Sequence, residues 1–124
     1  MQMIVGILQE SHPGERRVAI VPRDVLALRE TGIDVFVEEG AGVKANFLDS
    51  DYESVGARVV SKRDEVFSVA NVLLTMHSIG STSDQMNSDF DMLQAGQVLV
   101  GLLDPFGNPK AVRELADKGI MSFA

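Results

Sequence analysis

The chain has 124 residues, of which 45% are hydrophobic and 23% charged, which is typical of one soluble globular domain. The formal net charge of −7 excludes a basic nucleic-acid interface, because phosphates require a positively charged face. The absence of cysteine excludes disulfides and thiolate chemistry and suits a cytoplasmic protein.

No metal site and no membrane insertion are expected. Neither histidine of the chain, His12 or His77, has neighbours at the spacing of metal ligands. The N-terminus lacks the basic and long apolar regions of a signal peptide. No apolar stretch approaches the ~20 residues that a membrane-spanning helix needs.

Apolar runs alternate with helix signals along the first half of the chain. The expected elements are a strand over Met3–Leu8, a helix over Pro22–Thr31, a strand over Ile33–Glu38, a short helix capped by Asp49 or Ser50 and running through Val55, a strand over Ala57–Val60, and a helix to about Val69 opened by a capping box at Ser61–Asp64.

The same alternation continues in the second half. The expected elements are a strand over Asn71–Met76, a polar loop over Ser78–Asp89, a short helix over Phe90–Leu93, a strand over Gln97–Leu103, a helix over Asn108–Lys118 with Asn108 as its cap, and a strand over Ile120–Ala124. Such alternation with short connections predicts an α/β fold. We expect a single domain with an open, mostly parallel sheet and helices on both faces.

The run Gly40-Ala41-Gly42 follows an expected strand and has some features of a phosphate-binding loop. The dinucleotide fingerprint needs a third glycine three residues further on, at the start of a helix. Ala45 stands there, which the looser pattern tolerates, but the residues after it do not begin a convincing helix. A turn that requires glycine is therefore the favoured interpretation.

A charged loop containing Glu10, Glu15, Arg16 and Arg17 follows the first strand. One interpretation is a solvated loop with surface ion pairs, which contribute little to stability. The other is a site in which an arginine binds a carboxylate through two parallel hydrogen bonds. The charge pattern alone favours the solvated loop.

His77 and Asp104 each follow an expected strand. If the two strands are parallel neighbours, these side chains share one edge of the sheet and can act as an acid–base pair. The alternatives are a loop histidine without a task and a turn residue before Pro105, and the Asp-Pro sequence favours the turn.

Taken together, these runs resemble the N-terminal part of the alanine dehydrogenase and proton-translocating NAD(P) transhydrogenase alpha-subunit family. The residues that carry the resemblance are Gly6-Ile7, Glu10, Glu15, Arg17-Val18-Ala19, Pro22, Val37-Glu38, Gly40-Ala41-Gly42, Asp51-Tyr52, Gly56-Ala57, Ala70-Asn71-Val72-Leu73-Leu74 and Gly96-Gln97-Val98-Leu99. Their order and spacing cover essentially the whole chain.

The resemblance implies that residues 1–124 form an N-terminal, flavodoxin-like, substrate-side domain. In the family a separate Rossmann domain that binds NAD(H) follows this domain, and it is not present in this chain. We therefore expect NAD in the full-length parent and no tight cofactor binding here. Hydride transfer would be an activity of the larger oxidoreductase, and this domain alone would be inactive.

The expected cleft residues are Arg17, His77, Asp104 and Glu10, with catalytic and cofactor-binding residues unassigned. By the resemblance, Arg17 matches the arginine that holds the substrate carboxylate in alanine dehydrogenases. His77 and Asp104 replace their lysine and histidine, and the sequence from Asp104 to Pro109 is more similar to the transhydrogenase branch.

The transhydrogenase branch implies particular partners. These are the C-terminal NAD-binding domain, the NADP-binding subunit and the membrane subunit, in a homodimeric parent that is peripheral to the inner membrane. Two alternatives stay open: the substrate domain of an alanine-dehydrogenase-like enzyme, and a non-catalytic binding module that retains the fold.

Overall fold

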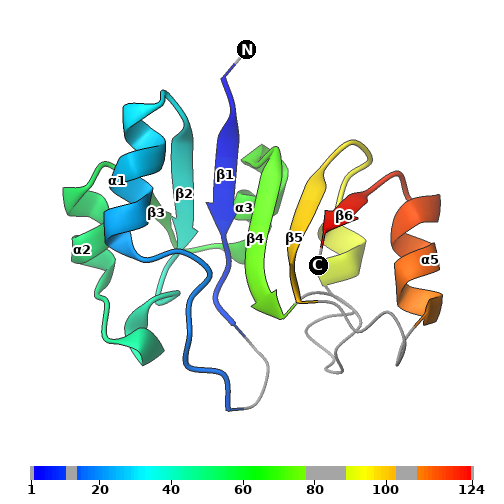
Figure 1. Cartoon of the computed structure of the whole chain (residues 1–124), viewed down its shortest axis with the longest axis horizontal. Helices are drawn as coiled ribbons and strands as arrows, with labels where there is room; N and C mark the ends of the chain where they lie inside the picture. The colour runs from blue at the N-terminus through cyan, green and yellow to red at the C-terminus, as the bar shows by residue number, and fades with distance from the viewer. Residues whose placement is uncertain (1, 11–13, 78–88, 103–108, 124) are drawn as a thin grey trace.

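The structure is a computed structural model that describes residues 2–10, 14–77, 89–102 and 109–123. Six strands form one sheet in the order β3-β2-β1-β4-β5-β6, and every recorded pairing is parallel (Figure 1). The strands are β1 (Ile4–Ile7), β2 (Asp34–Glu38), β3 (Arg58–Val60), β4 (Val72–His77), β5 (Val98–Leu102) and β6 (Met121–Phe123).

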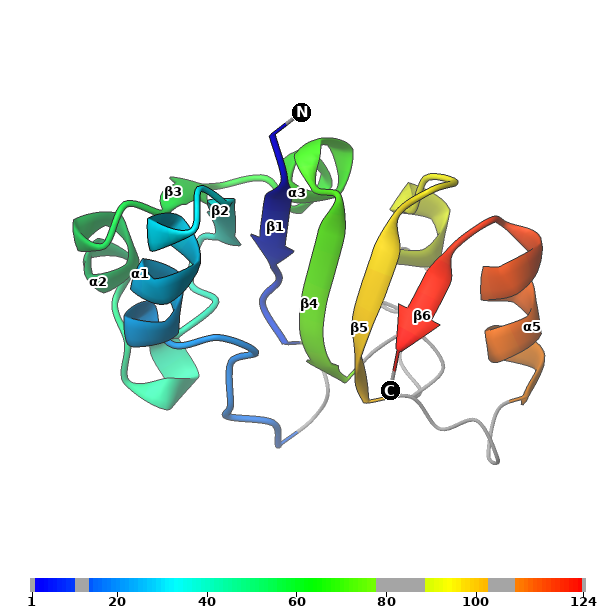
Figure 2. The same cartoon turned by 45° about the horizontal axis from the view of Figure 1, so that its top comes forward.

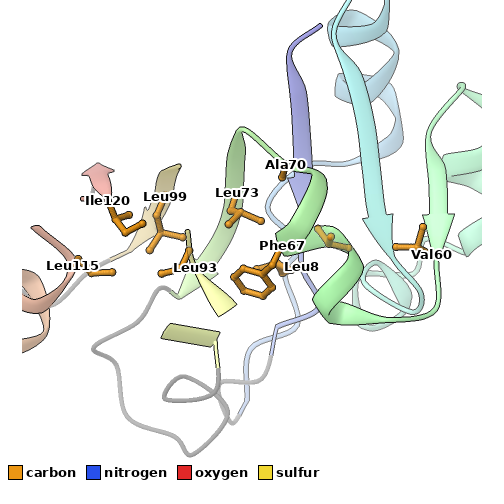
Figure 3. Packing of buried hydrophobic residues seen from close by; sticks show 10 residues of the cluster. Leu8, Val60, Phe67, Ala70, Leu73, Leu93, Leu99, Leu115 and Ile120 are labelled. Carbon is orange, nitrogen blue, oxygen red and sulfur yellow. The ribbon is translucent and has the colours of Figure 1, made fainter. Parts of the chain in front are cut away.

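Helices cover both faces of the sheet, which confirms the predicted fold class. They are α1 (Pro22–Glu30), the 3₁₀ turn η1 (Val43–Ala45), α2 (Asp49–Ser54), α3 (Arg63–Val69), a turn of helix at residues 89–92, and α5 (Pro109–Asp117). Val25 of α1 and Tyr52 of α2 pack in one apolar cluster with β1 and β2. Phe67 of α3 and Leu115 of α5 belong to a second cluster on the opposite face (Figure 3).

The strand order refines the flavodoxin-like prediction. The order 3-2-1-4-5-6 is that of dinucleotide-binding sheets, whereas flavodoxin has the order 2-1-3-4-5. An additional helix–strand unit, α2 and β3, extends the sheet beyond β2 and accounts for the difference. The direction of strand addition reverses between β1 and β4, so the switch point of this sheet lies between those strands.

Two predicted helix caps are wrong. Helix α3 begins at Arg63 after Lys62, with no side-chain cap, so Ser61 does not open it. The guanidinium of Arg63 is anchored by carboxylates from other elements, and this tertiary contact fixes the start of the helix. Helix α2 is preceded by Leu48, whose N–H donates to Asp51 Oδ2 at 2.8 Å. Asp49 lies inside α2 because its carboxylate accepts from the Gly40 N–H instead.

Some predictions fall on residues outside the described ranges. These include the polar loop up to residue 88, the Asn108 cap, Asp104 and the last residue of the final strand. Within the described part of the chain, no helix is long and apolar enough to span a membrane.

Gly6 lets α3 pack directly on β1. A Cβ atom at Gly6 would lie 2.6 Å from Val66 Cγ1 and 3.0 Å from the Ala70 Cβ. Real side chains do not approach this closely, so the helix could not keep its position if residue 6 had a side chain. The glycine that opens the family pattern is therefore required by helix–sheet packing.

We expect Gly6→Ala to lower the free energy of unfolding by about 1–3 kcal/mol, because the extra methyl overpacks the interface. Urea denaturation measures the change. The matched control is Gly6→Ala combined with Val66→Ala, which removes the nearest contact. If the methyl clashes with Val66, the double variant should lose less stability than the sum of the losses of the two single variants. Losses that simply add would contradict this packing role of Gly6.

Candidate functional site

Polar side chains gather at the carboxyl ends of β1, β2 and β4, around the switch point. Gln9 and Glu10 follow β1, Glu38 ends β2, and Met76 lies near the end of β4. Open parallel sheets bind ligands in the crevice at this place. The candidate functional site is therefore this edge of the sheet.

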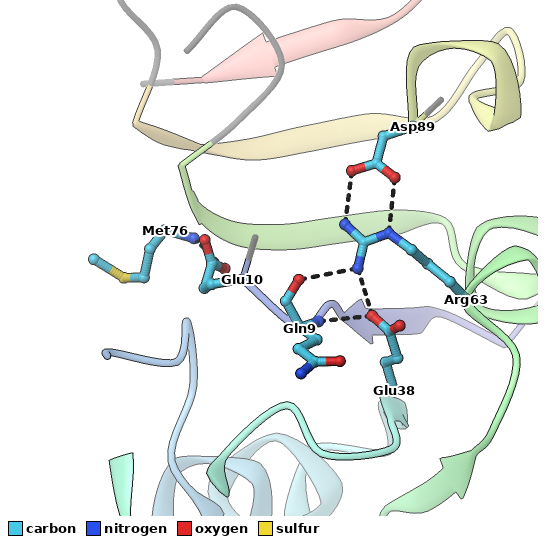
Figure 4. Close-up of polar contacts among 6 residues, drawn as sticks. All are labelled: Gln9, Glu10, Glu38, Arg63, Met76 and Asp89. Carbon is cyan, nitrogen blue, oxygen red and sulfur yellow. Dashed lines mark hydrogen bonds and ion pairs between the residues drawn. The ribbon is translucent and has the colours of Figure 1, made fainter. Parts of the chain in front are cut away.

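Arg63 joins several elements at this edge (Figure 4). Its Nε and Nη2 donate to the two carboxylate oxygens of Asp89 at 2.7 and 2.6 Å. Its Nη1 donates to Glu38 Oε1 at 2.5 Å and to the Gln9 carbonyl at 2.9 Å. We call Arg63, Glu38, Asp89 and Gln9 the Arg63 cluster.

The Arg63 cluster is largely removed from solvent. The side chains of Arg63, Glu38 and Asp89 are 15, 12 and 5% exposed. Burial lowers the pKa of Arg63, but the hydrogen bonds and charges of Asp89 and Glu38 outweigh burial, so its pKa is raised. The guanidinium stays charged and holds two carboxylates in place.

Glu10 supports the neighbouring end of β4. It is 7% exposed, and its Oε2 accepts a hydrogen bond from the Met76 N–H at 2.8 Å. The register between β4 and β5 shifts between Leu74 and His77, so the ladder is interrupted there. The Glu10 carboxylate thus satisfies a backbone donor where the strand is irregular, and it ties β1 to β4.

Arg17 lies on the exposed side of the charged loop. Its side chain is 61% exposed, whereas that of Glu15 is 7% exposed. Arg17 Nε and Nη2 donate to Glu15 Oε1 at 3.0 and 2.7 Å, and this hydrogen bond raises the pKa of Arg17. The arginine therefore already holds a carboxylate of its own loop, and Nη1 has no recorded partner among the described residues.

Tyr52 fixes the end of the same loop. Its side chain is fully buried, and its hydroxyl donates to the Ile20 carbonyl at 2.8 Å. Burial is the main cause that raises the pKa of Tyr52 to about 12. The contact joins α2 to the residues between Arg17 and α1.

The structure brings part of the predicted cleft together. Glu10 lies at the switch point, and His77 ends β4 beside Leu102 of β5. The two strands are parallel neighbours, which was the condition for the acid–base pair, but Asp104 lies outside the described residues, so the pair stays a prediction. No group of three or more histidine, aspartate or glutamate side chains within the described ranges could hold a metal ion.

Sequence reasoning does not find the Arg63 cluster. The local pattern places Arg63 in a capping box, and Glu38 and Asp89 are 25 and 26 residues away from it in the chain. The available signal is an acidic residue at the end of a predicted buried strand and an arginine at the start of the second predicted helix after that strand.

The described residues at the edge of the sheet do not fit a dinucleotide. The pyrophosphate of a dinucleotide needs free backbone N–H groups after β1, but the Gln9 N–H donates to Glu38 Oε1 at 2.8 Å. Glu38 stands at the end of β2, where a ribose-binding acid would stand, and it is engaged by Arg63. Two buried carboxylates, Glu10 and Glu38, add negative charge that disfavours phosphate.

The glycine run after β2 is a turn, as the favoured interpretation predicted. Gly40 has φ +80°, and its N–H donates to Asp49 Oδ1 at 2.9 Å. The Ala41 N–H donates to the Glu38 carbonyl. A Cβ at Gly42 would lie 2.7 Å from Tyr52 Cε2, so this glycine is needed for packing. The N–H groups of Gly40 and Ala41 are satisfied internally, which leaves no phosphate cradle.

The fold and site thus define a class of protein: a doubly wound α/β domain in which described polar groups at the switch point form hydrogen bonds with one another. A family model described as "Alanine dehydrogenase/PNT, N-terminal domain" matches residues 6–124. The chain belongs to this family, which confirms the resemblance seen in its sequence.

The relatives include both branches of the family. Alanine dehydrogenase of Methanococcus maripaludis is 30% identical over 98% of this chain and 31% of the relative. An NAD(P) transhydrogenase alpha subunit of Rickettsia prowazekii is 33% identical over the same shares. The crystal structure of transhydrogenase from Sinorhizobium meliloti matches with a TM-score of 0.85 and 34% identity, over 98% of this chain and 33% of that one. The chain thus spans about a third of the length of its relatives, which are oxidoreductases.

We expect Arg63→Ala to destabilise the domain by about 3 kcal/mol, because it leaves two buried carboxylates without their cation. Arg29→Ala is the matched control, since Arg29 pairs with Asp34 on the surface, where both side chains are more than one-third exposed. That change should cost below about 1 kcal/mol. Urea unfolding compares the two, and equal losses would contradict the role assigned to Arg63.

The single tyrosine allows a direct test of the Tyr52 contact, since the chain has no tryptophan. We expect the phenol to titrate with a pKa of about 12, against an ordinary value of 10. Because the folded pKa is the higher one, the contribution of Tyr52 is complete below pH 10 and is lost as pH rises towards 12. Absorbance at the phenolate band measures the titration, and an ordinary pKa in the folded protein would contradict the buried contact.

Proposed function

We propose that this chain is the N-terminal domain of the NAD(H)-binding alpha subunit of a proton-translocating NAD(P) transhydrogenase. In such an enzyme hydride passes between NAD(H) and NADP(H), each held by its own component. This domain forms one wall of the NAD cleft and does not catalyse alone. Its partners are a C-terminal NAD-binding domain, the NADP-binding subunit and the membrane subunit.

The observation that carries the proposal is the filled switch point. The sheet has a dinucleotide-binding strand order, yet the Arg63 cluster and Glu10 occupy the place of the phosphates and ribose. A protein built in this way needs a second domain to hold the cofactor. The chain supplies a rigid edge against which a cofactor held elsewhere can be positioned.

The charged residues of this edge have separate tasks in the proposal. The Arg63 cluster fixes the ends of β1 and β2 relative to α3. Glu10 holds the end of β4, where His77 is the last residue. Arg17 is exposed and offers an Nη1 group that the described residues leave unused, so it can bind an anionic group that enters the cleft.

The transhydrogenases are 33 and 34% identical to this chain and the alanine dehydrogenases of Methanococcus maripaludis and Mycobacterium tuberculosis 30 and 31%, so identity favours this branch only slightly. By the resemblance, His77 and Asp104 also stand in place of the lysine and histidine of alanine dehydrogenases, and the sequence from Asp104 to Pro109 is more similar to the transhydrogenase branch. In the proposal the parent is a homodimer in the cytoplasm, attached to the inner membrane through its partner subunits.

An alanine-dehydrogenase-like enzyme is the second candidate. The geometry of Arg17 favours this candidate, because its Nε and Nη2 already donate hydrogen bonds to the carboxylate of Glu15. A substrate carboxylate could be bound in the same way by Nη1 or by exchange with Glu15. In this case the full-length protein would reduce NAD with alanine, and Arg17→Ala would abolish that turnover.

We expect the full-length gene product to bind NADH and residues 1–124 to show no heat of NADH binding in calorimetry. Tight binding by residues 1–124 would contradict the need for a second domain. Two activities distinguish the candidates. A transhydrogenase transfers hydride from NADH to an NADP analogue in the presence of the partner subunits, whereas an alanine-dehydrogenase-like enzyme reduces NAD with alanine. Arg17→Ala should abolish the alanine-dependent reaction if the second candidate holds. If the full-length protein had neither activity and did not bind NADH, the result would support a non-catalytic binding module.

A further inference from the structure

A pocket opens between the loop that precedes α1 and the turn η1. Its volume is about 430 Å³, and the described residues that line it are Gly14, Glu15, Arg16 and Lys44. Figures 1 and 2 show this loop and η1 side by side at the end of the molecule towards which β1 and β4 point. Pockets for small molecules have volumes of roughly 300–1,000 Å³, so this one is large enough for a small metabolite. We call it the Arg16–Lys44 pocket.

Both cations of the pocket are available to a ligand. The side chains of Arg16 and Lys44 are exposed, and no hydrogen bond or ion pair joins either of them to a described residue. By contrast, Arg17, Arg29 and Arg63 each bind a carboxylate of the chain. In a chain with a net charge of −7, two unpartnered cations on one pocket form a local excess of positive charge. Such an excess attracts anions from solution.

The carboxylate that lines the pocket does not cancel this charge. The side chain of Glu15 is 7% exposed and pairs with Arg17. Its Oε1 accepts from Arg17 Nη2 at 2.7 Å, and its Oε2 accepts from the Arg16 N–H at 3.1 Å. Arg17 therefore neutralises Glu15, and the Arg16 and Lys44 side chains leave two positive charges at the pocket. Neither buried carboxylate of the switch point is among the described lining residues.

We propose that the Arg16–Lys44 pocket binds the phosphate group of a small organic phosphate monoester. Such a group carries about −1.5 to −2 charges at pH 7, which matches the two cations, whereas a single carboxylate would neutralise only one of them. The guanidinium of Arg16 offers parallel N–H donors to two phosphate oxygens, and Lys44 adds a point charge on a flexible stem. The proposal goes beyond the proposed function and does not depend on which reaction the parent performs.

The test is an NMR titration of the ¹⁵N-labelled 124-residue chain with glycerol 3-phosphate at constant ionic strength, so that general screening does not change. The amide signals of Gly14, Arg16 and Lys44 should move and reach saturation. Succinate, whose two charges lie on separate carboxylates, should bind several times more weakly. The Gln9 and Gly40 amides belong to the switch point, so their signals test the filled switch point independently of this pocket.

Variants with matched controls separate this pocket from general charge attraction. Arg16→Ala and Lys44→Ala should each raise the dissociation constant of glycerol 3-phosphate roughly three- to fivefold, because each removes one exposed charge contact. Arg23→Ala and Lys62→Ala remove cations that are also exposed but are not among the described lining residues, and they should leave the affinity unchanged. Any one of three results overturns the proposal: no saturable shifts at the pocket, equal weakening by the control variants, or succinate binding as tightly as glycerol 3-phosphate.

Discussion

The guanidinium of Arg63 is the contact on which this edge of the molecule depends. It binds Asp89 through two hydrogen bonds and reaches Glu38 and the Gln9 carbonyl through its third nitrogen. The ends of β1 and β2, the start of α3 and the helical turn at 89–92 thereby share one charged group. Buried ions are stable only when their partners are all present, so these segments hold one arrangement relative to one another.

This constraint bears on why a sheet with the strand order of dinucleotide-binding domains does not itself offer a phosphate site at its described residues. In that order the end of β1 offers backbone N–H groups to phosphate. Here the Gln9 N–H donates to Glu38, and the Glu10 carboxylate accepts from the Met76 N–H. These two backbone donors, one on each side of the switch point, are satisfied from within the described part of the chain. This edge is charged, which suits the proposal that a separate domain holds the cofactor.

The sequence predicted those features that are written in local patterns. The apolar run of β1, the proline that starts α1 and the glycine turn after β2 each follow from neighbouring residues. The caps failed because Arg63 and Asp49 are engaged by groups distant in sequence, which no local pattern reveals. Glu10 was expected in the cleft and lies just after β1, but its hydrogen bond to the Met76 N–H depends on the register shift between β4 and β5. The sequence showed Gly6 as part of a motif, but only the structure shows that the close packing of α3 on β1 requires a glycine there.

The most direct measurement of the central claim is an amide NMR titration of residues 1–124 with pyrophosphate. If the switch point is filled by the chain's own hydrogen bonds, the amide signals of Gln9 and Gly40 should not move. Saturable shifts at these two amides would contradict the account, because they would show that the edge of the sheet is open to a dinucleotide phosphate.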